Sequence, residues 1–484
     1  MNYKMMGRFT AQILFIEGLF LFPPLFISLY LSEAAAIRGF LLTLAITAVL
    51  AVLLFLFCRD AKTIFQATDG MVCVAFSWIV LSLIGALPFY FSREIPGFVD
   101  ALFETVSGFT TTGASILTAV EPMSKGLLFW RSFTHWVGGM GVLVFLLAIA
   151  PAKGSEKGFT MHLLRAESPG PSVGKLVPKM RKTAGILYLM YIGLTLMDFL
   201  LLLLGGMSVF EAICTAFGTA GTGGFGVKND SIAGYSPYLQ NVTTVFMLLF
   251  GVNFSCYYLL LMRQFKSVFK DEELRLYIAI VLGSIGLIVW NLWGFYPTAG
   301  ETVRHAAFQV SSIITTTGFA TTDFDLWPSF SKTILLCLMV VGACAGSTGG
   351  GIKVARVLLL FKSLKRNIAQ MLHPRSVKLV RNNGAVVDER VISNTNAYLV
   401  AYVLIVFGSF IVISLDGFST GTNFSAVLAC LNNIGPGLEM VGPVCNYASY
   451  GILSKLVLTM DMLLGRLEIF PILVLFSYQT WKNR

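Results

Sequence analysis

Charged residues are scarce in this sequence. Only 12% of its 484 residues are Asp, Glu, Lys or Arg, whereas soluble domains carry about 25%. Hydrophobic residues make up 56% of the chain, and its mean hydropathy is +0.77. No soluble core could enclose so much apolar sequence, which excludes a soluble globular protein. Because a membrane-spanning helix needs roughly 20 apolar residues, we predict an all-α polytopic membrane protein.

The cysteine and histidine patterns that bind metals are also lacking. The eight cysteines are scattered and form no CxxC pair, and most lie in apolar segments, as free buried thiols do. The four histidines show no metal-ligand spacing; they are His135, His162, His305 and His373. The sequence therefore predicts no metal site built from these two residue types.

A nucleotide-binding phosphate loop is absent as well. The stretch GSTGGGIK ends at Lys353 and resembles the pattern GxxxxGK[ST], but Ile352 stands where the lysine is needed. Val354 then follows the lysine in place of Ser or Thr. No cytoplasmic segment is long enough for a nucleotide domain. These departures exclude an ATP-using enzyme or pump, and we predict that the chain is not an enzyme.

Long apolar runs are what the sequence has in abundance, and ten of them predict spans. They lie at 9–31, 38–57, 70–92, 126–150, 183–205, 240–262, 276–296, 333–361 (broken), 396–415 and 451–480. The first run is too long for a signal peptide and contains Glu17, so it is interpreted as a retained helix. After the first two, the spans come in pairs. Each pair encloses a segment too short to span, which follows residue 92, 205, 296 or 415.

The distribution of charged residues predicts the orientation of the chain in the membrane. With the N-terminus inside, Lys and Arg outnumber Asp and Glu in the cytoplasmic segments, and the reverse holds outside. Both termini and the loops 151–182, 263–275 and 362–395 are then cytoplasmic, and the four short segments open to the outside. The net charge of +10 is thus a topology signal and needs no nucleic acid to explain it.

The four short segments resemble one another. They read DALFETVSGFTTTGAS, FEAICTAFGTAGTGGF, HAAFQVSSIITTTGFA and TNFSAVLACLNNIGPG. Each has about ten helix-compatible residues followed by a stretch ending in glycine. That glycine is Gly113, Gly318 or Gly435 in the first, third and fourth. In the second, Gly221, Gly223 and Gly224 compete; Phe217 precedes Gly221 as Phe109 precedes Gly113, which favours Gly221.

The physics of this unit is specific. Non-helical backbone at membrane depth survives only when it is buried in protein or lines a watery cavity. A short helix ending there points its negative end at the cavity, and the extended stretch supplies carbonyls that can replace an ion's hydration shell. The sequence therefore predicts four pseudo-repeats of helix, pore helix, filter and helix around one pore, plus two extra N-terminal helices.

Three further strings carry a resemblance to a known family. They are CAGSTGGGIK at Cys344–Lys353, HPR at His373–Arg375 and GRLEIF at Gly465–Phe470. With the four short segments they make nearly the whole chain resemble the Trk/Ktr/HKT superfamily of potassium transporters. The two extra N-terminal spans resemble the Trk branch. The resemblance implies a homodimer with one pore per subunit, K⁺ as the bound and transported ion, no organic cofactor, and gating by a cytosolic ring of RCK-type nucleotide-binding subunits.

The resemblance also implies which residues form the site. The K⁺ filter would comprise Thr110, Thr111, Thr112, Gly113, Thr219, Ala220, Gly221, Thr222, Gly223, Thr315, Thr316, Thr317, Gly318, Asn432, Asn433, Ile434 and Gly435. Its second-repeat glycine would be Gly221 or Gly223. An intramembrane gate would comprise Gly346, Ser347, Thr348, Gly349, Gly350, Gly351, Lys353 and Arg466. Because no TVGYG occurs and the four stretches differ, selectivity for K⁺ over Na⁺ stays open.

Charges near the pore have competing interpretations. Arg466 lies in mid-span, which favours a functional role because ionisable groups in the membrane are usually functional; the resemblance implies that it faces the gate loop. Lys353 either faces the pore or extends to the cytoplasmic edge, and for Arg356 the second interpretation is favoured. Basic residues of the loop 362–395 either dock a partner or anionic lipid or only reflect topology; they are Lys362, Lys365, Arg366, Arg375 and Lys378.

The predicted organisation follows from these assignments. It comprises two N-terminal helices (1–69), pore repeat 1 (70–150), a cytoplasmic loop (151–182), repeat 2 (183–262), repeat 3 with the gate loop 342–353 (263–361), a second cytoplasmic loop (362–395) and repeat 4 (396–484). We predict K⁺ uptake across the cytoplasmic membrane. The alternative is a broken-helix secondary transporter that couples cation entry to Na⁺ or H⁺ symport, although the four segments share one direction.

Overall fold

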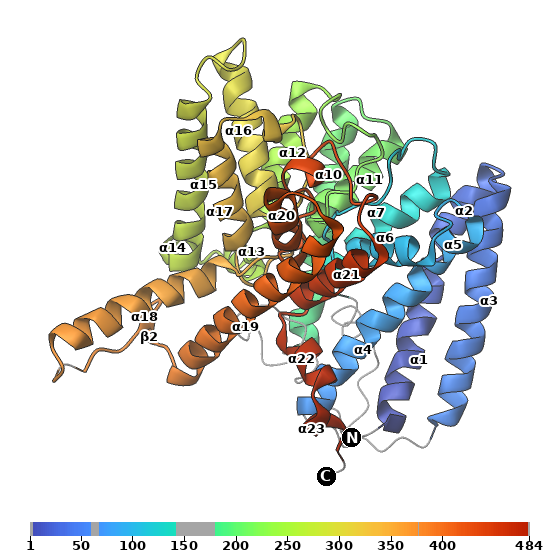
Figure 1. Ribbon diagram of the computed structural model, residues 1–484, viewed down its shortest axis with the longest axis horizontal. Coiled ribbons are helices and arrows are strands. Elements are labelled where there is room, and N and C mark those ends of the chain that lie inside the picture. Colours follow the sequence, from blue (N-terminus) through green and yellow to red (C-terminus); the bar gives the residue numbers. More distant parts are fainter. Residues whose placement is uncertain (1–2, 60–66, 142–179, 376, 483–484) are drawn as a thin grey trace.

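The computed structural model describes residues 3–59, 67–141, 180–375 and 377–482. Within these ranges the chain is almost entirely helical (Figure 1), which confirms the predicted all-α class. Helices prevail because a lipid-embedded backbone must satisfy its hydrogen bonds within its own segment. The strands described are β1 (Arg381–Asn382) and β2 (Ala385–Val386), which pair antiparallel around one turn.

Two spans precede the repeated part of the chain. The first combines α1 (Tyr3–Phe20) and α2 (Phe22–Tyr30), and the second is α3 (Ala34–Phe57). They pack against the first repeat at one edge of the molecule (Figure 1). The packing is close, since a Cβ on Gly39 of α3 would lie 2.6 Å from the carbonyl oxygen of Pro88.

The helices that follow adopt the same order four times: an outer helix, a short helix, an extended segment and a second helix. The outer helices are α4 (Ala67–Gly85) with α5 (Leu87–Ser92), α10 (Met180–Leu204), α15 (Glu272–Asn291) and α19 (Glu389–Ile413). The short helices are α6 (Phe98–Phe109), α11 (Val209–Gly221), α16 (Ala299–Ile314) and α20 (Thr420–Leu431). The second helices are α7 (Lys125–Gly139), α12 (Pro237–Phe250), α17 (Ser329–Val341) and α21 (Ile452–Arg466).

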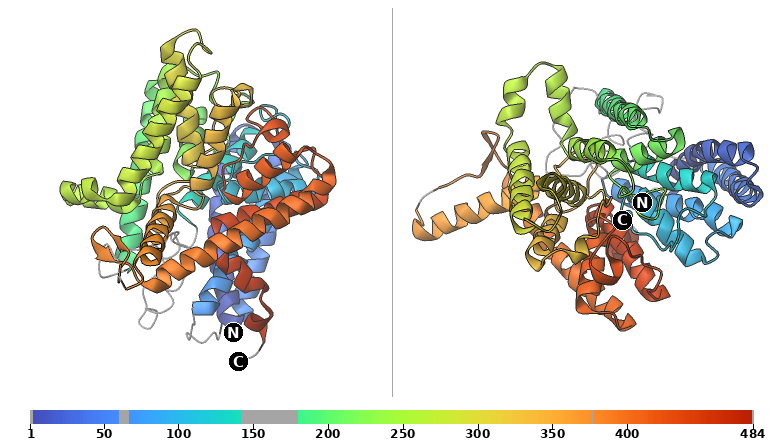
Figure 2. Two further views of the ribbon diagram at one scale, coloured as in Figure 1. Left: turned by 60° about the vertical axis from the view of Figure 1, so that its left-hand side comes forward. Right: turned by 90° about the horizontal axis from the view of Figure 1, so that it is seen from above.

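The remaining elements connect or extend these four units. They are α13 (Phe254–Leu261), α14 (Phe265–Lys270), α18 (Val354–Leu372), α22 (Phe470–Phe476), α23 (Tyr478–Trp481) and three 3₁₀ turns, η1 (Phe324–Leu326), η2 (Ser414–Asp416) and η3 (Glu439–Val441). Seen from above, the four units follow one another around a common centre (Figure 2). The chain ends lie together (Figure 1), with the rings of Tyr3 and Trp481 stacked 6.3 Å apart.

Two of the second helices, α12 and α21, end before the spans predicted for them, whereas the break predicted within 333–361 is present between α17 and α18. Six helices of the described part are long and apolar enough to cross a membrane, and α12 with α13 makes a seventh only as a pair bent by 90°. The bend replaces the continuous span predicted at 240–262. At the bend Asn253 caps α13, accepting from the Ser255 amide at 2.9 Å, and the distant residue Cys344 donates its amide to the carbonyl of Gly251 at 3.1 Å. The last predicted span, 451–480, is likewise divided, at Glu468 and Ile469, both with positive φ.

The basic loop predicted at 362–395 is largely structured. Helix α18 is amphipathic and continues past the predicted span end to Leu372, projecting from the bundle beside α19 (Figure 1). Lys362 forms an ion pair with Glu272, and Arg366 forms one with Glu389. The other predicted loop, 151–182, falls mostly outside the described residues, as does the end of the first repeat after residue 141.

Candidate functional site

The four short helices each run into a segment with the same backbone shape. The second residue of each segment is left-handed although it is not glycine: φ is 55° at Thr111, 54° at Thr222, 58° at Thr316 and 56° at Asn433. The fourth is a left-handed glycine, with φ of 80° at Gly113, 77° at Gly224, 83° at Gly318 and 97° at Gly435. Such residues are uncommon, so the recurrence identifies equivalent positions. We call residues 110–113, 221–224, 315–318 and 432–435 the ring segments.

Hydrogen bonds confirm the equivalence. In each segment the third residue's amide donates to the carbonyl five residues earlier: Thr112 to Ser107 (2.8 Å), Gly223 to Gly218 (2.8 Å), Thr317 to Ser312 (2.8 Å) and Ile434 to Ala429 (2.9 Å). The second residue's amide donates three residues back in all four. These bonds close the end of each short helix and leave the next peptide units free for other contacts.

The four segments close into a ring. A Cβ on the segment glycine would lie 2.1 Å from Gly223 O at Gly113, 2.0 Å from Thr317 O at Gly224, 2.1 Å from Ile434 O at Gly318 and 2.7 Å from Thr112 O at Gly435. Each glycine thus contacts the carbonyl that precedes the glycine of the next segment, in chain order and back to the first. Only glycine satisfies both the positive φ and this approach.

The prediction for the second segment is therefore wrong. Gly224, and neither Gly221 nor Gly223, corresponds to Gly113. Residues Thr219 to Gly221 belong to α11, and Gly221 corresponds to Thr110. The spacing of the phenylalanines pointed to the wrong glycine because Phe217 and Phe109 are not equivalent. Aligning the threonine of GTGG with the middle threonine of TTTG would have found the register.

A small vestibule lies against the ring, with a volume of about 180 Å³. All four segment glycines line it, together with Arg131, Lys228, Cys445 and Tyr447 among others. Tyr447 donates its hydroxyl to the carbonyl of Gly435 at 2.7 Å. The ring is thus accessible from the side of the loops that follow the ring segments.

The predicted gate loop, residues 342–353, touches the ring directly. The amide of Gly350 donates to Thr316 Oγ1 (2.6 Å), and that of Gly351 donates to the carbonyl of Asn432 (3.1 Å). The loop is also bonded to the bend between α12 and α13, where the Phe254 amide donates to the carbonyl of Gly346 at 3.0 Å. The loop therefore contacts the third and fourth ring segments and the second helix of unit 2.

Arg466, at the end of α21, lies where the sequence placed it, opposite this loop. Its guanidinium donates to the carbonyl of Thr348 (3.0 Å) and to Thr111 Oγ1 in the first ring segment (3.3 Å). It also donates to the carbonyls of Gly138 and Gly139 at the end of α7. One side chain of unit 4 thus links the loop of unit 3 to the ring and second helix of unit 1.

Comparison with known proteins identifies the family. The family model described as "Cation transport protein", TrkH, matches residues 34–482. This chain belongs to the TrkH family. It is 36% identical over 491 residues to the Trk system potassium uptake protein TrkH of Salmonella typhimurium, covering 100% of both chains. It is 33% identical to the Trk system potassium uptake protein TrkG of Escherichia coli, covering 100% of this chain and 99% of the relative.

The fold agrees with that family. The crystal structure of the potassium transporter TrkH from Vibrio parahaemolyticus superimposes with a TM-score of 0.88 at 31% identity, covering 100% of both chains. The predicted resemblance to the Trk branch is confirmed, and so is the prediction that the chain is not an enzyme, since the TrkH family consists of transporters. The chain is a multi-span membrane protein of that family.

The structure bears differently on the predictions for two charged residues at the end of the gate loop, Lys353 and Arg356. Lys353 is only 3% exposed, and its Nζ donates to the carbonyl of Gly349 within the loop, so it does not extend to the membrane edge. A role for it in the ion path stays a prediction. For Arg356 the favoured interpretation is wrong. Its side chain is buried, forms an ion pair with Glu468 and lies 4.1 Å from the centre of the Tyr398 ring.

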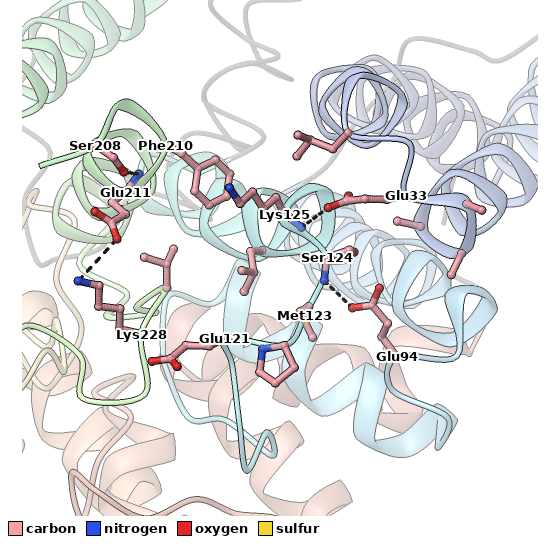
Figure 3. A pocket seen from close by; sticks show the side chains of 17 residues that line it. Glu33, Glu94, Glu121, Met123, Ser124, Lys125, Ser208, Phe210, Glu211 and Lys228 are labelled. Carbon is pink, nitrogen blue, oxygen red and sulfur yellow. Dashed lines mark hydrogen bonds and ion pairs between the residues drawn. The ribbon is translucent and has the colours of Figure 1, made fainter.

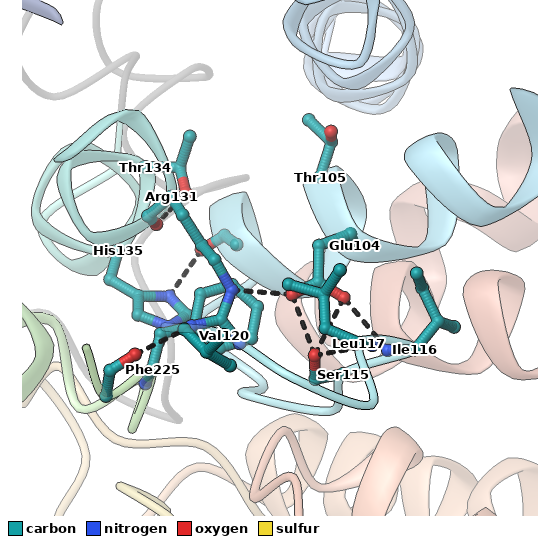
Figure 4. Close-up of polar contacts among 12 residues, drawn as sticks. Glu104, Thr105, Ser115, Ile116, Leu117, Val120, Arg131, Thr134, His135 and Phe225 are labelled. Carbon is teal, nitrogen blue, oxygen red and sulfur yellow. Dashed lines mark hydrogen bonds and ion pairs between the residues drawn. The ribbon is translucent and has the colours of Figure 1, made fainter. Parts of the chain in front are cut away.

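A polar cluster behind the ring was not predicted (Figure 4). Arg131 Nε of α7 donates to Glu104 Oε1 of α6 at 2.6 Å, and both side chains are buried. The guanidinium carbon of Arg131 lies 3.5 Å from the centre of the Phe225 ring, directly after the second ring segment. His135, one turn further along α7, is fully buried. Opposite charges in two neighbouring apolar segments were the signal that the sequence offered.

A larger cavity of about 890 Å³ lies beside α2, α7 and α11 (Figure 3), and no ring residue lines it. Its carboxylates are already engaged. Glu33 accepts from the amides of Lys125 (2.7 Å) and Gly126 (3.0 Å), and Glu94 accepts from that of Ser124 (3.0 Å). They stabilise the positive end of α7. The described residues contain no cluster of three or more His, Cys, Asp or Glu suited to a metal.

Proposed function

We propose that this chain takes up K⁺ across the cytoplasmic membrane through a channel-like pore that passes through the ring. The observation that carries the proposal is the closure of four equivalent backbone segments, each at the carboxyl end of a short helix. The relatives named above, potassium uptake proteins of the Trk system, support the same ion.

The chemistry of the ring suits a dehydrated monovalent cation. Each short helix contributes the equivalent of roughly half a negative charge at its carboxyl end, and four such ends converge. Carbonyl oxygens can replace the hydration shell of K⁺ without a charged side chain, so the ion binds but still leaves. No organic cofactor is required for this step.

The gate loop is proposed to close the path on the cytoplasmic side of the ring. Its amides engage Thr316 and the carbonyl of Asn432, and Arg466 fixes the carbonyl of Thr348. Glycines let the backbone leave the helix here; Gly342, Gly346 and Gly351 all have positive φ. Opening would move the loop away from the ring and break these bonds.

The proposal also covers the orientation of the chain in the membrane, its oligomeric state and its partner. Both termini and the basic segment 362–395 lie on the cytoplasmic side of the inner membrane, and the vestibule opens outside. Two copies form a homodimer in contact with membrane lipid, and a cytosolic ring of RCK-type nucleotide-binding subunits moves the gate loop. The exposed basic side chains Lys365, Arg375 and Lys378 are available for that contact, whereas Lys362 and Arg366 are held in ion pairs.

Rb⁺ or K⁺ uptake in a potassium-transport-deficient cell, with and without an RCK partner, tests this function. Gly318→Ala should abolish uptake, because φ is +83° and the new Cβ would lie 2.1 Å from Ile434 O. Gly300→Ala on α16, the short helix that leads into this ring segment, is the matched control, since nothing lies within 4 Å of its Cβ position. Equal uptake by both variants would contradict a pore through the ring.

Deleting residues 346–350 tests the gate. Uptake by the deletion variant should rise and depend less on the partner, and unchanged, still-regulated uptake would refute the gate. The alternative, a secondary transporter with broken helices, draws on the 90° bend between α12 and α13. It predicts uptake that follows an imposed Na⁺ or H⁺ gradient at constant membrane potential, which the channel-like pore does not.

A further inference from the structure

The second ring segment lacks the side chains that support the others. In the first segment the hydroxyls of Thr110 and Thr112 lie 2.8 Å apart, and in the third those of Thr315 and Thr317 are also 2.8 Å apart. In the fourth, Asn432 Nδ2 donates to the hydroxyl of Tyr402 at 2.9 Å. The corresponding positions in the second segment are Gly221 and Gly223, which have no side chains to form such contacts.

The imidazole of His135 fills the space behind this segment. A Cβ on Gly223 would lie 2.2 Å from His135 Cγ, 2.3 Å from Nδ1 and 2.5 Å from Cδ2. A Cβ on Gly221 would lie 2.2 Å from the carbonyl oxygen of His135. Real side chains do not approach so closely, so the imidazole of His135 requires glycine at position 223, and the backbone of residue 135 requires glycine at position 221.

Both ring nitrogens of His135 are engaged, and by different units (Figure 4). Nδ1 lies 2.7 Å from the carbonyl oxygen of Gly108 at the end of α6. The amide of Phe225, directly after Gly224, donates to Nε2 at 3.2 Å. Because Nε2 accepts, the proton resides on Nδ1 and the imidazole is neutral. The side chain thus joins the first short helix to the second ring segment.

The histidine is itself held firmly. It is fully buried, and its ring centre lies 4.2 Å from that of Phe225. Arg131 lies against the same phenylalanine and donates to the carbonyl of Gly226 at 3.0 Å. Glu104 fixes Arg131 in turn. Packing and hydrogen bonds therefore fix the imidazole in one orientation.

We propose that His135 is a positioning residue that fixes the carbonyl of Gly223 and thereby the width of the ring. It does for the second segment what paired threonine hydroxyls do for the first and third. The inference rests on the proposed function, since ring width matters for the choice of K⁺ over Na⁺ only if cations pass through the ring. Carbonyl rings select between K⁺ and Na⁺ by the number of their oxygens and the distance of these oxygens from the ion. If the second ring segment is held less firmly, the ring should therefore admit Na⁺ more readily.

Three variants test the proposal: His135→Ala, Gly223→Thr, and the two combined. Rb⁺ uptake and its inhibition by Na⁺ are measured in a potassium-transport-deficient cell, with the amount of protein in the membrane determined for each. His135→Ala should keep uptake but lower the preference for Rb⁺ over Na⁺ by about fivefold or more, since two buried hydrogen bonds to the ring region are lost. Gly223→Thr alone should abolish uptake, because its side chain meets the imidazole. The combination should restore uptake.

His305→Ala is the control. This histidine lies on α16, bonds Thr321 Oγ1 at 3.0 Å, and is no part of the ring segments, so its replacement should leave the cation preference unchanged. A folded His135→Ala protein with wild-type preference would overturn the proposal, as would normal uptake by Gly223→Thr.

Thermal unfolding in detergent separates this proposal from the proposed function. The Tm of the combined variant should exceed that of Gly223→Thr, whether or not the protein transports. Absence of Rb⁺ uptake by the wild-type chain would refute the transport function alone. A combined variant no more stable than Gly223→Thr would refute the exchange between His135 and residue 223.

Discussion

Replacing Arg466 by glutamine should open the gate loop. In the closed state that we propose, the guanidinium binds the loop through a hydrogen bond to the carbonyl of Thr348 at 3.0 Å. Its other acceptors, Thr111 Oγ1 and the carbonyls of Gly138 and Gly139, belong to unit 1 and stay in place when the loop moves. Arg466→Gln therefore removes a contact that exists only while the loop is closed.

The size of the effect follows from that single contact. A hydrogen bond to a charged group contributes about 1.5–3 kcal/mol, and about 1.4 kcal/mol changes an equilibrium constant tenfold. The ratio of open to closed loops should therefore rise roughly 10- to 100-fold. The amides of Gly350 and Gly351 still hold the loop, so we expect the lower end of this range.

Partner-free Rb⁺ uptake measures this ratio directly as long as the closed loop predominates. Uptake by Arg466→Gln should rise about tenfold and respond less to the RCK partner. Arg366→Gln, which removes a cation from an ion pair on α18 away from the ring, is the control and should transport as the wild type does. If Arg466→Gln reaches the membrane in normal amount and keeps the wild-type Tm and uptake, the arginine does not hold the gate.

Two further predictions concern other parts of the molecule. Cys445 lines the vestibule, so a cationic thiol reagent applied outside should reduce uptake, and Cys445→Ser should be insensitive. Burial, and then the carboxylates of Asp323 and Asp325, raise the pKa of this thiol. Because only the thiolate reacts, labelling should accelerate as pH rises. A labelling rate that does not depend on pH would contradict this prediction. Arg131→Met should destabilise the protein by about 3–5 kcal/mol, because it leaves a buried carboxylate unpaired. Adding Glu104→Leu should recover part of the lost Tm, and a double variant no more stable than the single one would count against the buried pair.

The class of protein and most of the candidate site could be predicted from the amino-acid sequence alone. Apolar runs and the distribution of basic residues are properties of neighbouring residues, so they could be read without a structure. The repeated TTTG gave the first and third ring segments, and the glycine cluster before Lys353 gave the gate loop. Arg466 was placed opposite the loop by the family resemblance, and its position in mid-span, where a cation is costly, favoured a functional role.

Three features became clear from the folded chain: the register of the second segment, the pairing of Arg356 with Glu468 and the break between α12 and α13. Each depends on contacts between residues far apart in the chain. His135 and Phe225 are 90 residues apart, yet the imidazole fills the space where Gly223 would otherwise carry a side chain. A local pattern does not record which distant side chain occupies that space, and so the second segment, which has glycines where TTTG has its first and third threonines, was the one the sequence misplaced.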